Sequence, residues 1–162
     1  MLARRGYEVY GLDYSPNNIK TARELSQPSL EFAVHDMRDS FPWKDFDLIC
    51  NLFTSFGYFD SDEEHRQTLV NCYESLLPGG HMILDFLNTH WVVKNAKPHV
   101  KKTANGIEFS LSKEFQDGFL VNQIRFEVEG KQHHYQERVR AFEKDELISL
   151  FVEVGFEISA IF

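Results

Sequence analysis

The sequence is poor in cysteine and in long apolar runs, and each shortage excludes a class of protein. Its two cysteines, Cys50 and Cys72, stand in apolar surroundings without the spacing of a metal site, so we expect two buried, reduced thiols. No segment approaches the ~20 apolar residues of a membrane span. The first residues, MLARRGYEV, contain no apolar stretch long enough for a signal peptide. A cytoplasmic protein without a membrane partner is therefore expected.

Positive charge is also scarce. Lys and Arg number 17 against 25 Asp and Glu, which gives a formal net charge of −8. Binding to a phosphate backbone needs clustered Lys and Arg, so we expect no nucleic-acid partner. The chain has 162 residues, of which 43% are hydrophobic, and this suits one domain with a sizeable core.

Several catalytic motifs are missing too. The chain has no phosphate loop of the Gly-Lys-Ser/Thr type and no Gly-x-Ser-x-Gly elbow, which argues against a hydrolase. His133 and His134 are adjacent in a predicted strand, so they point to opposite faces and cannot bind one metal ion together. We therefore expect no metal site.

The first half of the chain does contain an alternation of strand and helix. Pro16, with Ser15 as its N-cap, begins one helix, and the acidic segment 60–77 predicts a second, amphipathic helix that PGG ends. The predicted strands are YEVYGLD (7–13), LEFAVHD (30–36), FDLICNLF (46–53) and HMILDFLN (81–88). FDLICNLF is apolar almost throughout, which is typical of a parallel strand covered on both faces. The alternation predicts an α/β fold with a Rossmann-like, mostly parallel sheet flanked by helices.

The second half changes to long alternating runs broken by turn signals. Asn105-Gly106 and Asp117-Gly118 are strong hairpin signals, and Glu129-Gly130 is a weaker one. They predict an antiparallel β-meander between about residues 100 and 142. A helix over 143–155 and a strand over 156–162 follow. We accordingly divide a single domain, 1–162, into a Rossmann-like core (1–88 and 143–162) and an antiparallel insertion (89–142).

Polar residues stand at the carboxyl ends of the predicted parallel strands, where ligands bind in sheets of this class. They are Asp13, Asp36, Asn51 and Asn88. An acidic residue at a strand tip can accept hydrogen bonds from both hydroxyls of a ribose, and Asp13 suits this role. Asp36 and Met37 could hold an adenine edge. The alternative for each Asp is a helix cap or a turn residue.

The sequence resembles the class I S-adenosylmethionine-dependent methyltransferases. The resemblance is carried, in the family's order, by YEVYGLDYSPNNIKTARE, FAVHDMRD, FDLICNLFTSFGYF with its acidic helix, LLPGGHMILDFLN and FEKDELISLFVEVGF. It implies S-adenosylmethionine as the cofactor. The insertion resembles members that methylate a small-molecule acceptor. The segment NLFTSFGYF lacks the Pro-Pro-aromatic arrangement with which methylases of exocyclic base amines grip a flipped base, which again disfavours nucleic acid.

The resemblance implies roles for residues around the adenosine. Asp13 would bind the ribose hydroxyls, and Tyr14 would flank the adenine. Asp36 would accept a hydrogen bond from the adenine amino group, while Met37 would pack on the ring.

The resemblance also implies which residues surround the methionine portion of the cofactor and the methyl acceptor. Asn51, Leu52 and Phe53 would line the methionine end of the cofactor. The side chains expected near the acceptor are Phe56, Tyr58, Asn88, His90 and Arg140. Core packing is the alternative for the aromatic residues, a surface position for His90, and an ion pair with an acid on a neighbouring strand for Arg140. A sulfonium methyl group is already activated, so the protein need only align the acceptor and exclude water, and we assign no catalytic base.

One family feature is absent, namely the first strand with its glycine-rich loop. It should lie upstream of Leu2, and its strand would lie between those ending at Asp13 and Asn51, so two apolar edges stay open. We expect that Met1 is an internal start of a longer protein. The alternative is a short chain that closes the gap as a homodimer.

Two other functions compete with methyl transfer. One is a non-catalytic methyltransferase-like protein that self-associates through exposed sheet edges. The other is a dinucleotide-dependent oxidoreductase, since an Asp at a strand tip also suits that cofactor. The LLPGG strand and the missing second nucleotide-binding half argue against the oxidoreductase.

Overall fold

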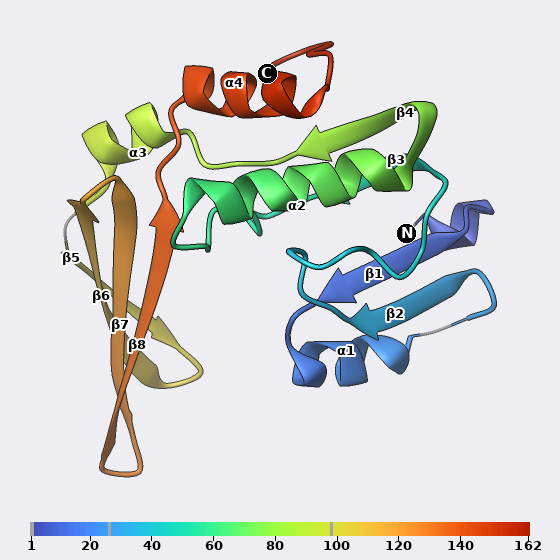
Figure 1. Cartoon of the computed structure of the whole chain (residues 1–162). Coiled ribbons are helices and arrows are strands. Elements are labelled where there is room, and N and C mark those ends of the chain that lie inside the picture. Colours follow the sequence, from blue (N-terminus) through green and yellow to red (C-terminus); the bar gives the residue numbers. More distant parts are fainter. Residues whose placement is uncertain (1, 26, 98) are drawn as a thin grey trace.

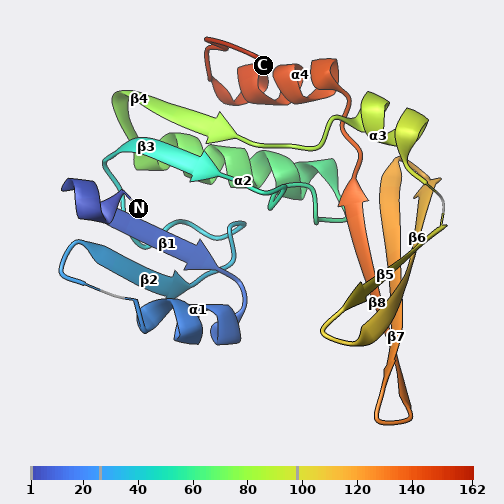
Figure 2. The ribbon, with the colours of Figure 1, turned by 180° about the vertical axis from the view of Figure 1, so that it is seen from behind.

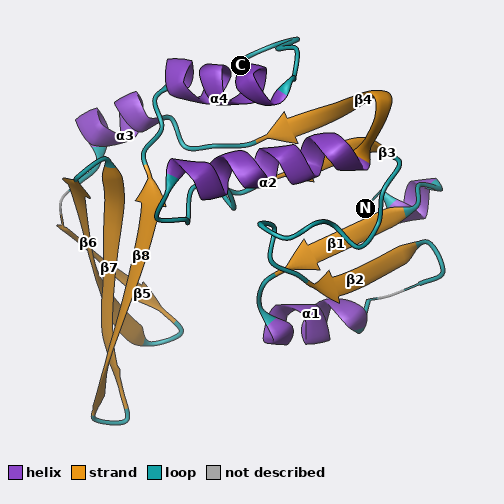
Figure 3. Cartoon of the chain, in the orientation of Figure 1, coloured by secondary structure: helices purple, strands orange, loops and turns teal. Residues whose placement is uncertain are grey.

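The computed structural model describes residues 2–25, 27–97 and 99–162, and it confirms the predicted alternation of strands and helices (Figures 1 and 3). A short 3-10 helix, Ala3–Arg5, comes first. The parallel strands are β1 (Val9–Asp13), β2 (Leu30–Val34), β3 (Phe46–Asn51) and β4 (Leu76–Leu84). The helices are α1 (Pro16–Arg23), α2 (Asp62–Ser75), α3 (Thr89–Asn95) and α4 (Lys144–Val154). The antiparallel strands are β5 (His99–Ala104), β6 (Ile107–Gln116), β7 (Phe119–Val128) and β8 (Lys131–Arg140).

The parallel strands form two pairs, and among the described residues no strand lies between β1 and β3, where the sequence predicted that a family strand is missing. β1 pairs with β2, and β3 pairs with β4, each as a separate two-stranded parallel sheet. All four strands run the same way (Figures 1 and 2). Aromatic rings connect the pairs, because Tyr10 of β1 lies 4.8 Å from Trp43 and 5.6 Å from Phe46 of β3, measured between ring centroids. The carboxyl ends of all four strands therefore point the same way, towards the side of the molecule that carries the antiparallel sheet (Figure 1).

The three predicted helices are confirmed, and each begins within two residues of its predicted start. Ser15 caps α1, its hydroxyl accepting the Asn18 N–H at 3.3 Å. Ser61 caps α2 in a capping box with Glu64, in which each side chain accepts the other residue's backbone N–H. The end of α2 differs from the prediction, since the helix ends at Ser75 and the PGG segment belongs to β4.

The main buried cluster lies on one face of the β3–β4 pair. Phe56, Leu69, Phe142 and Phe151 form it, and half-buried side chains of β4, among them Met82, pack against it. These residues join α2 and α4 to the loop after β3 and to the segment after β8. This cluster packs the β3–β4 pair, α2 and α4 against the segment that leads out of the antiparallel sheet.

The opposite face of the β3–β4 pair is bare, which corrects two predictions. The register puts Cys50 opposite Ile83, with Leu48 two residues before Cys50. Leu48 is 44% exposed, Ile83 is 50% exposed and Cys50 is exposed. Within the described residues no helix covers this face (Figure 2). β3 is therefore covered on one face, and of the two thiols that we expected to be buried, only Cys72 is.

The predicted antiparallel meander is confirmed as a four-stranded sheet in the order β5-β6-β7-β8. Each of the three predicted turns has positive φ at both central residues, from 50° at Asn105 to 80° at Gly106. This is the geometry that two-residue hairpins need. The sheet is attached to the core along β8, where the Arg140 N–H donates to the Gly57 carbonyl at 2.6 Å.

Two segments differ from the prediction. α3 was not predicted, although Asn88 caps it by accepting the Trp91 N–H at 3.0 Å. Residues 156–162 were predicted as a strand, but they are irregular, because within the described residues no strand pairs with them. No helix in the described part of the chain is long and apolar enough to cross a membrane.

Candidate cofactor and acceptor site

Asp13 ends β1, and its carboxylate organises the turn into α1. Oδ1 accepts the Ser15 N–H at 2.7 Å, and Oδ2 accepts the Asn18 side-chain amide at 3.1 Å. A carboxylate has about four lone-pair sites, so each oxygen can accept a further donor. Tyr14, the next residue, is 74% exposed. The first predicted site residues thus stand in a fixed turn at the tip of β1.

Asp36 lies just after β2 and is held by Arg38. The Arg38 guanidinium donates to both carboxylate oxygens, at 3.1 and 2.7 Å, and also to Glu64 of α2 at 2.6 Å. Hydrogen bonding from Arg38, against the smaller effect of burial, lowers the pKa of Asp36. The carboxylate is therefore charged, and it can still accept from a further donor.

Met37 joins the tips of β2 and β3. Its carbonyl accepts the Asn71 side-chain amide at 3.0 Å, and its sulfur lies 3.9 Å from Nδ2 of Asn51. The Asn71 amide also donates to the Asp39 carbonyl at 2.9 Å, so α2 fixes this loop at two points. Oδ1 of Asn51 is buried without a hydrogen-bond partner among the described residues. An unpaired buried acceptor at a strand tip suits a ligand that brings a donor.

The loop after β3 exposes apolar side chains. Leu52 is 42% exposed and Phe53 is 89% exposed. Asp85, which follows β4, accepts the Phe53 N–H through its carboxylate at 3.0 Å. The sequence prediction missed Asp85. Its signal was an acidic residue inside the otherwise apolar segment HMILDFLN.

The loop from Phe56 to Ser61 reaches towards the antiparallel sheet. Phe56 is 0% exposed and belongs to the buried cluster, so core packing accounts for it and we leave it out of the site. Tyr58 is half exposed, and burial together with the nearby Glu137 carboxylate raises the pKa of its phenol. His65 of α2 is fully buried beneath this loop.

The remaining predicted acceptor residues have structural partners. Asn88 is the N-cap of α3, and His90 is exposed on that helix. Arg140 is largely buried, and it contacts Asp62 of α2 at 3.3 Å and Glu146 of α4 at 3.0 Å. Its partners are thus at the starts of two helices, whereas the sequence suggested an acid on a neighbouring strand. This arrangement fastens β8 to α2 and α4.

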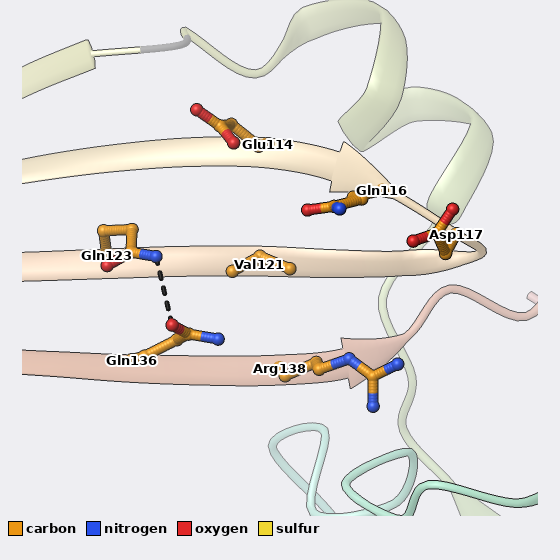
Figure 4. Close-up of a pocket in the computed structure, with 7 residues that line it drawn as sticks. All are labelled: Glu114, Gln116, Asp117, Val121, Gln123, Gln136 and Arg138. Atoms are coloured by element: carbon orange, nitrogen blue, oxygen red, sulfur yellow. Dashed lines mark hydrogen bonds between the residues drawn. The ribbon is translucent and has the colours of Figure 1, made fainter.

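The antiparallel sheet carries a polar pocket of about 220 Å³ (Figure 4). Its lining residues are Glu114, Gln116, Asp117, Val121, Gln123, Gln136 and Arg138. Gln123 donates to Gln136 at 3.1 Å across the β7–β8 pair. None of the predicted site residues lines this pocket. The candidate site therefore remains at the tips of the parallel strands.

Several solved methyltransferase structures share this fold. A S-adenosylmethionine-dependent methyltransferase from Clostridium acetobutylicum ATCC 824 matches 93% of the chain with a TM-score of 0.78 at 16% identity. The CcbJ methyltransferase from Streptomyces caelestis matches 95% with a TM-score of 0.80 at 17% identity. CalS10, an amino pentose methyltransferase from Micromonospora echinaspora, matches 95% with a TM-score of 0.74 at 20% identity. At these identities the matches define a methyltransferase-like fold.

The family follows from the sequence itself. The profile of a family described as "Methyltransferase domain" matches residues 1–84, just over half of the chain. The chain therefore belongs to the class I S-adenosylmethionine-dependent methyltransferase family. It spans 65% and 66% of the Clostridium and CcbJ proteins and 68% of CalS10. A search of curated proteins found no match.

Proposed function

We propose that this protein binds S-adenosylmethionine at the tips of its parallel strands and transfers the methyl group to a small-molecule acceptor. The observation that carries the proposal is the set of hydrogen-bond acceptors gathered at these strand tips. The family to which the chain belongs uses S-adenosylmethionine. Asp13 and Asp36 are fixed carboxylates with acceptor capacity to spare, and Asn51 adds an unpaired buried oxygen. The cofactor carries hydroxyl, amino and ammonium groups, which are donors, so the residues present fit it.

Residues at three strand tips would each bind a different part of the cofactor. Asp13 would take the ribose hydroxyls and the exposed Tyr14 would flank the adenine. Asp36 would accept from the adenine amino group, beside Met37. The loop of Asn51, Leu52 and Phe53 would face the methionine portion.

The bound cofactor supplies an activated methyl group, and this chain's residues supply alignment. Tyr58 is the half-exposed side chain of the loop that joins this end to the antiparallel sheet. Asn88 and His90 of α3 and Arg140 of β8 complete the proposed acceptor side. Arg140 is already paired with two carboxylates. A role in positioning its neighbours therefore suits it better than direct binding of a substrate carboxylate.

A sugar or another polar metabolite is the acceptor class that the comparisons favour. CalS10 is described as an amino pentose methyltransferase, and KedS8 from Streptoalloteichus, at 15% identity and a TM-score of 0.71, as a sugar N-methyltransferase. The net charge of −8 disfavours a polyanionic acceptor. We expect the protein to act in the cytoplasm.

Calorimetric titration with S-adenosylhomocysteine tests the proposal. We expect micromolar binding, about −8 kcal/mol. D13A should weaken it about tenfold or more, because each lost charge-assisted hydrogen bond is worth roughly 1.5–3 kcal/mol. D47A is the matched control, since Asp47 is an exposed acid at the opposite end of β3. Unchanged affinity in D13A would show that the ribose assignment is wrong.

A second candidate function is self-association without catalysis. The bare face that contains Leu48 and Ile83, together with the edges of β1 and β3 that carry no strand partner among the described residues, favours it. Light scattering decides this point. A concentration-dependent dimer that binds no S-adenosylhomocysteine supports this reading, and a monomer that binds the ligand contradicts it.

A further inference from the structure

We propose that Asp85 is a positioning residue that holds Phe53 and Thr54 in a strained loop and so presents Phe53 to the ligand. The contact between this loop and a ligand rests on the proposed function. The geometry of the loop stands independently of it. The inference adds to the site a residue that touches neither cofactor nor acceptor.

The strain lies in two consecutive residues. Phe53 has φ of 59° and Thr54 has φ of 55°, both in the left-handed region. This conformation is unfavourable for side chains with a Cβ, and most of all for a β-branched residue such as Thr. Asn105, Asp117 and Glu129 also have positive φ, but each precedes a glycine in a two-residue hairpin that requires it. Asp45 has φ of 66°, but it is a single residue of a type that tolerates this region. No hairpin explains Phe53 and Thr54.

Three hydrogen bonds from Asp85 impose the conformation. Its N–H donates to the Asn51 carbonyl at 2.8 Å, and its carbonyl accepts the Thr54 N–H at 3.2 Å. Its carboxylate Oδ2 accepts the Phe53 N–H at 3.0 Å. The two backbone bonds would survive a change of side chain, whereas the bond to Phe53 depends on the carboxylate. A charged acceptor makes this the strongest kind of bond in the loop.

The held loop leaves the ring of Phe53 exposed. Phe53 is 89% exposed although a phenylalanine gains free energy from burial. The unpaired Oδ1 of Asn51 lies two residues before it. Strain, an exposed ring and an unpaired acceptor in one loop are expected together where a ligand covers all three.

Thermal unfolding tests the strain and needs no ligand. T54G should raise Tm, because glycine adopts positive φ without penalty, and T54A should raise it less, since alanine loses the β-branch but retains the Cβ. In the D85A background the gain from T54G should shrink, because the loop can then relax. An equal gain in both backgrounds would overturn the proposal.

Calorimetry with S-adenosylhomocysteine tests the consequence for binding. We expect D85A to bind at least about tenfold more weakly and D85N to recover most of the affinity, since the asparagine oxygen can accept the Phe53 N–H. D47A is again the charge-matched control. Wild-type affinity in D85A, or equal losses in D85A and D85N, would overturn the role. If the unsubstituted chain binds no S-adenosylhomocysteine, the proposed function fails, while the thermal cycle still decides whether Asp85 positions the loop.

Discussion

Nε2 of His65 accepts the backbone N–H of Phe59 at 3.4 Å, while Nδ1 of the same ring donates to the Ser61 carbonyl at 2.8 Å. Since a backbone N–H can only donate, the ring is neutral, with its proton on Nδ1. The ring is fully buried, 5.1 Å from the ring of Phe56 and 5.0 Å from that of Phe142. Burial lowers the pKa of His65 below its usual 6.5, against the backbone carbonyls that favour the charged ring.

This buried ring predicts a loss of stability in mild acid. The unfolded chain binds a proton at His65 near pH 6.5, and the folded chain binds it only at lower pH. The contribution of neutral His65 to the free energy of unfolding is therefore fully present above pH 6.5. It is lost as pH falls towards the pKa of the folded state. We expect the urea midpoint to fall between pH 7.5 and 5, and H65F to flatten that slope. The exposed His90 is the control, and a slope that H90A flattens as much would contradict the assignment.

Loss of the buried side-chain amide of Asn71 should lower stability markedly. Its side chain is 3% exposed and donates to the Met37 and Asp39 carbonyls. N71A should lower the free energy of unfolding by about 2 kcal/mol, because it removes two hydrogen bonds that a buried side chain donates to the loop. R38Q, which removes two surface ion pairs from the same loop, should change the urea midpoint less. Equal effects of the two substitutions would show that Asn71 does not anchor the loop.

Substitution of Gly57 should cost more stability than substitution of Gly79, although both glycines have positive φ. Gly57 has φ of 100°, and a Cβ there would lie 3.0 Å from both Phe86 and Val139. Gly79 has φ of 80° with open space around it. Denaturation should show G57A less stable than G79A by about 1–3 kcal/mol, the cost of overpacking beyond that of the backbone. Equal losses would mean that Phe86 and Val139 move aside.

The two thiols should differ in reactivity. Cys50 is exposed, whereas Cys72 is 2% exposed and burial raises the pKa of its thiol to about 12. Ellman's reagent should therefore label one thiol in the folded protein at pH 8 and both in urea. C50S should abolish labelling of the folded chain. Labelling of both thiols without denaturant would contradict the packing of α2.

Local signals predicted much of the fold. Ser15 before Pro16 and Asn105-Gly106 determine the backbone within a few residues of themselves, so the helix start and the hairpin are where the sequence suggested. Cys50 was mispredicted, because its burial depends on a layer packed from elsewhere. The partners of Arg140 and the bond from Asp85 to Phe53 join residues that are distant in sequence. No local pattern encodes such contacts, and the residue types alone therefore located the strand tips but not what holds them.

The division of the parallel strands into two pairs affects how the molecule opens. The cluster of Phe56, Leu69, Phe142 and Phe151 belongs with β3, β4, α2 and α4, whereas β1, α1 and β2 meet that half through rings such as Tyr10 and Trp43. Amide protons of Val9–Asp13 and Leu30–Val34 should therefore exchange with solvent through a partial opening that leaves α2 protected. The turn that carries Asp13 would open with them. A ligand bound there should then slow exchange across the whole β1–α1–β2 unit, because the ligand would stabilise the closed state over the partly open one.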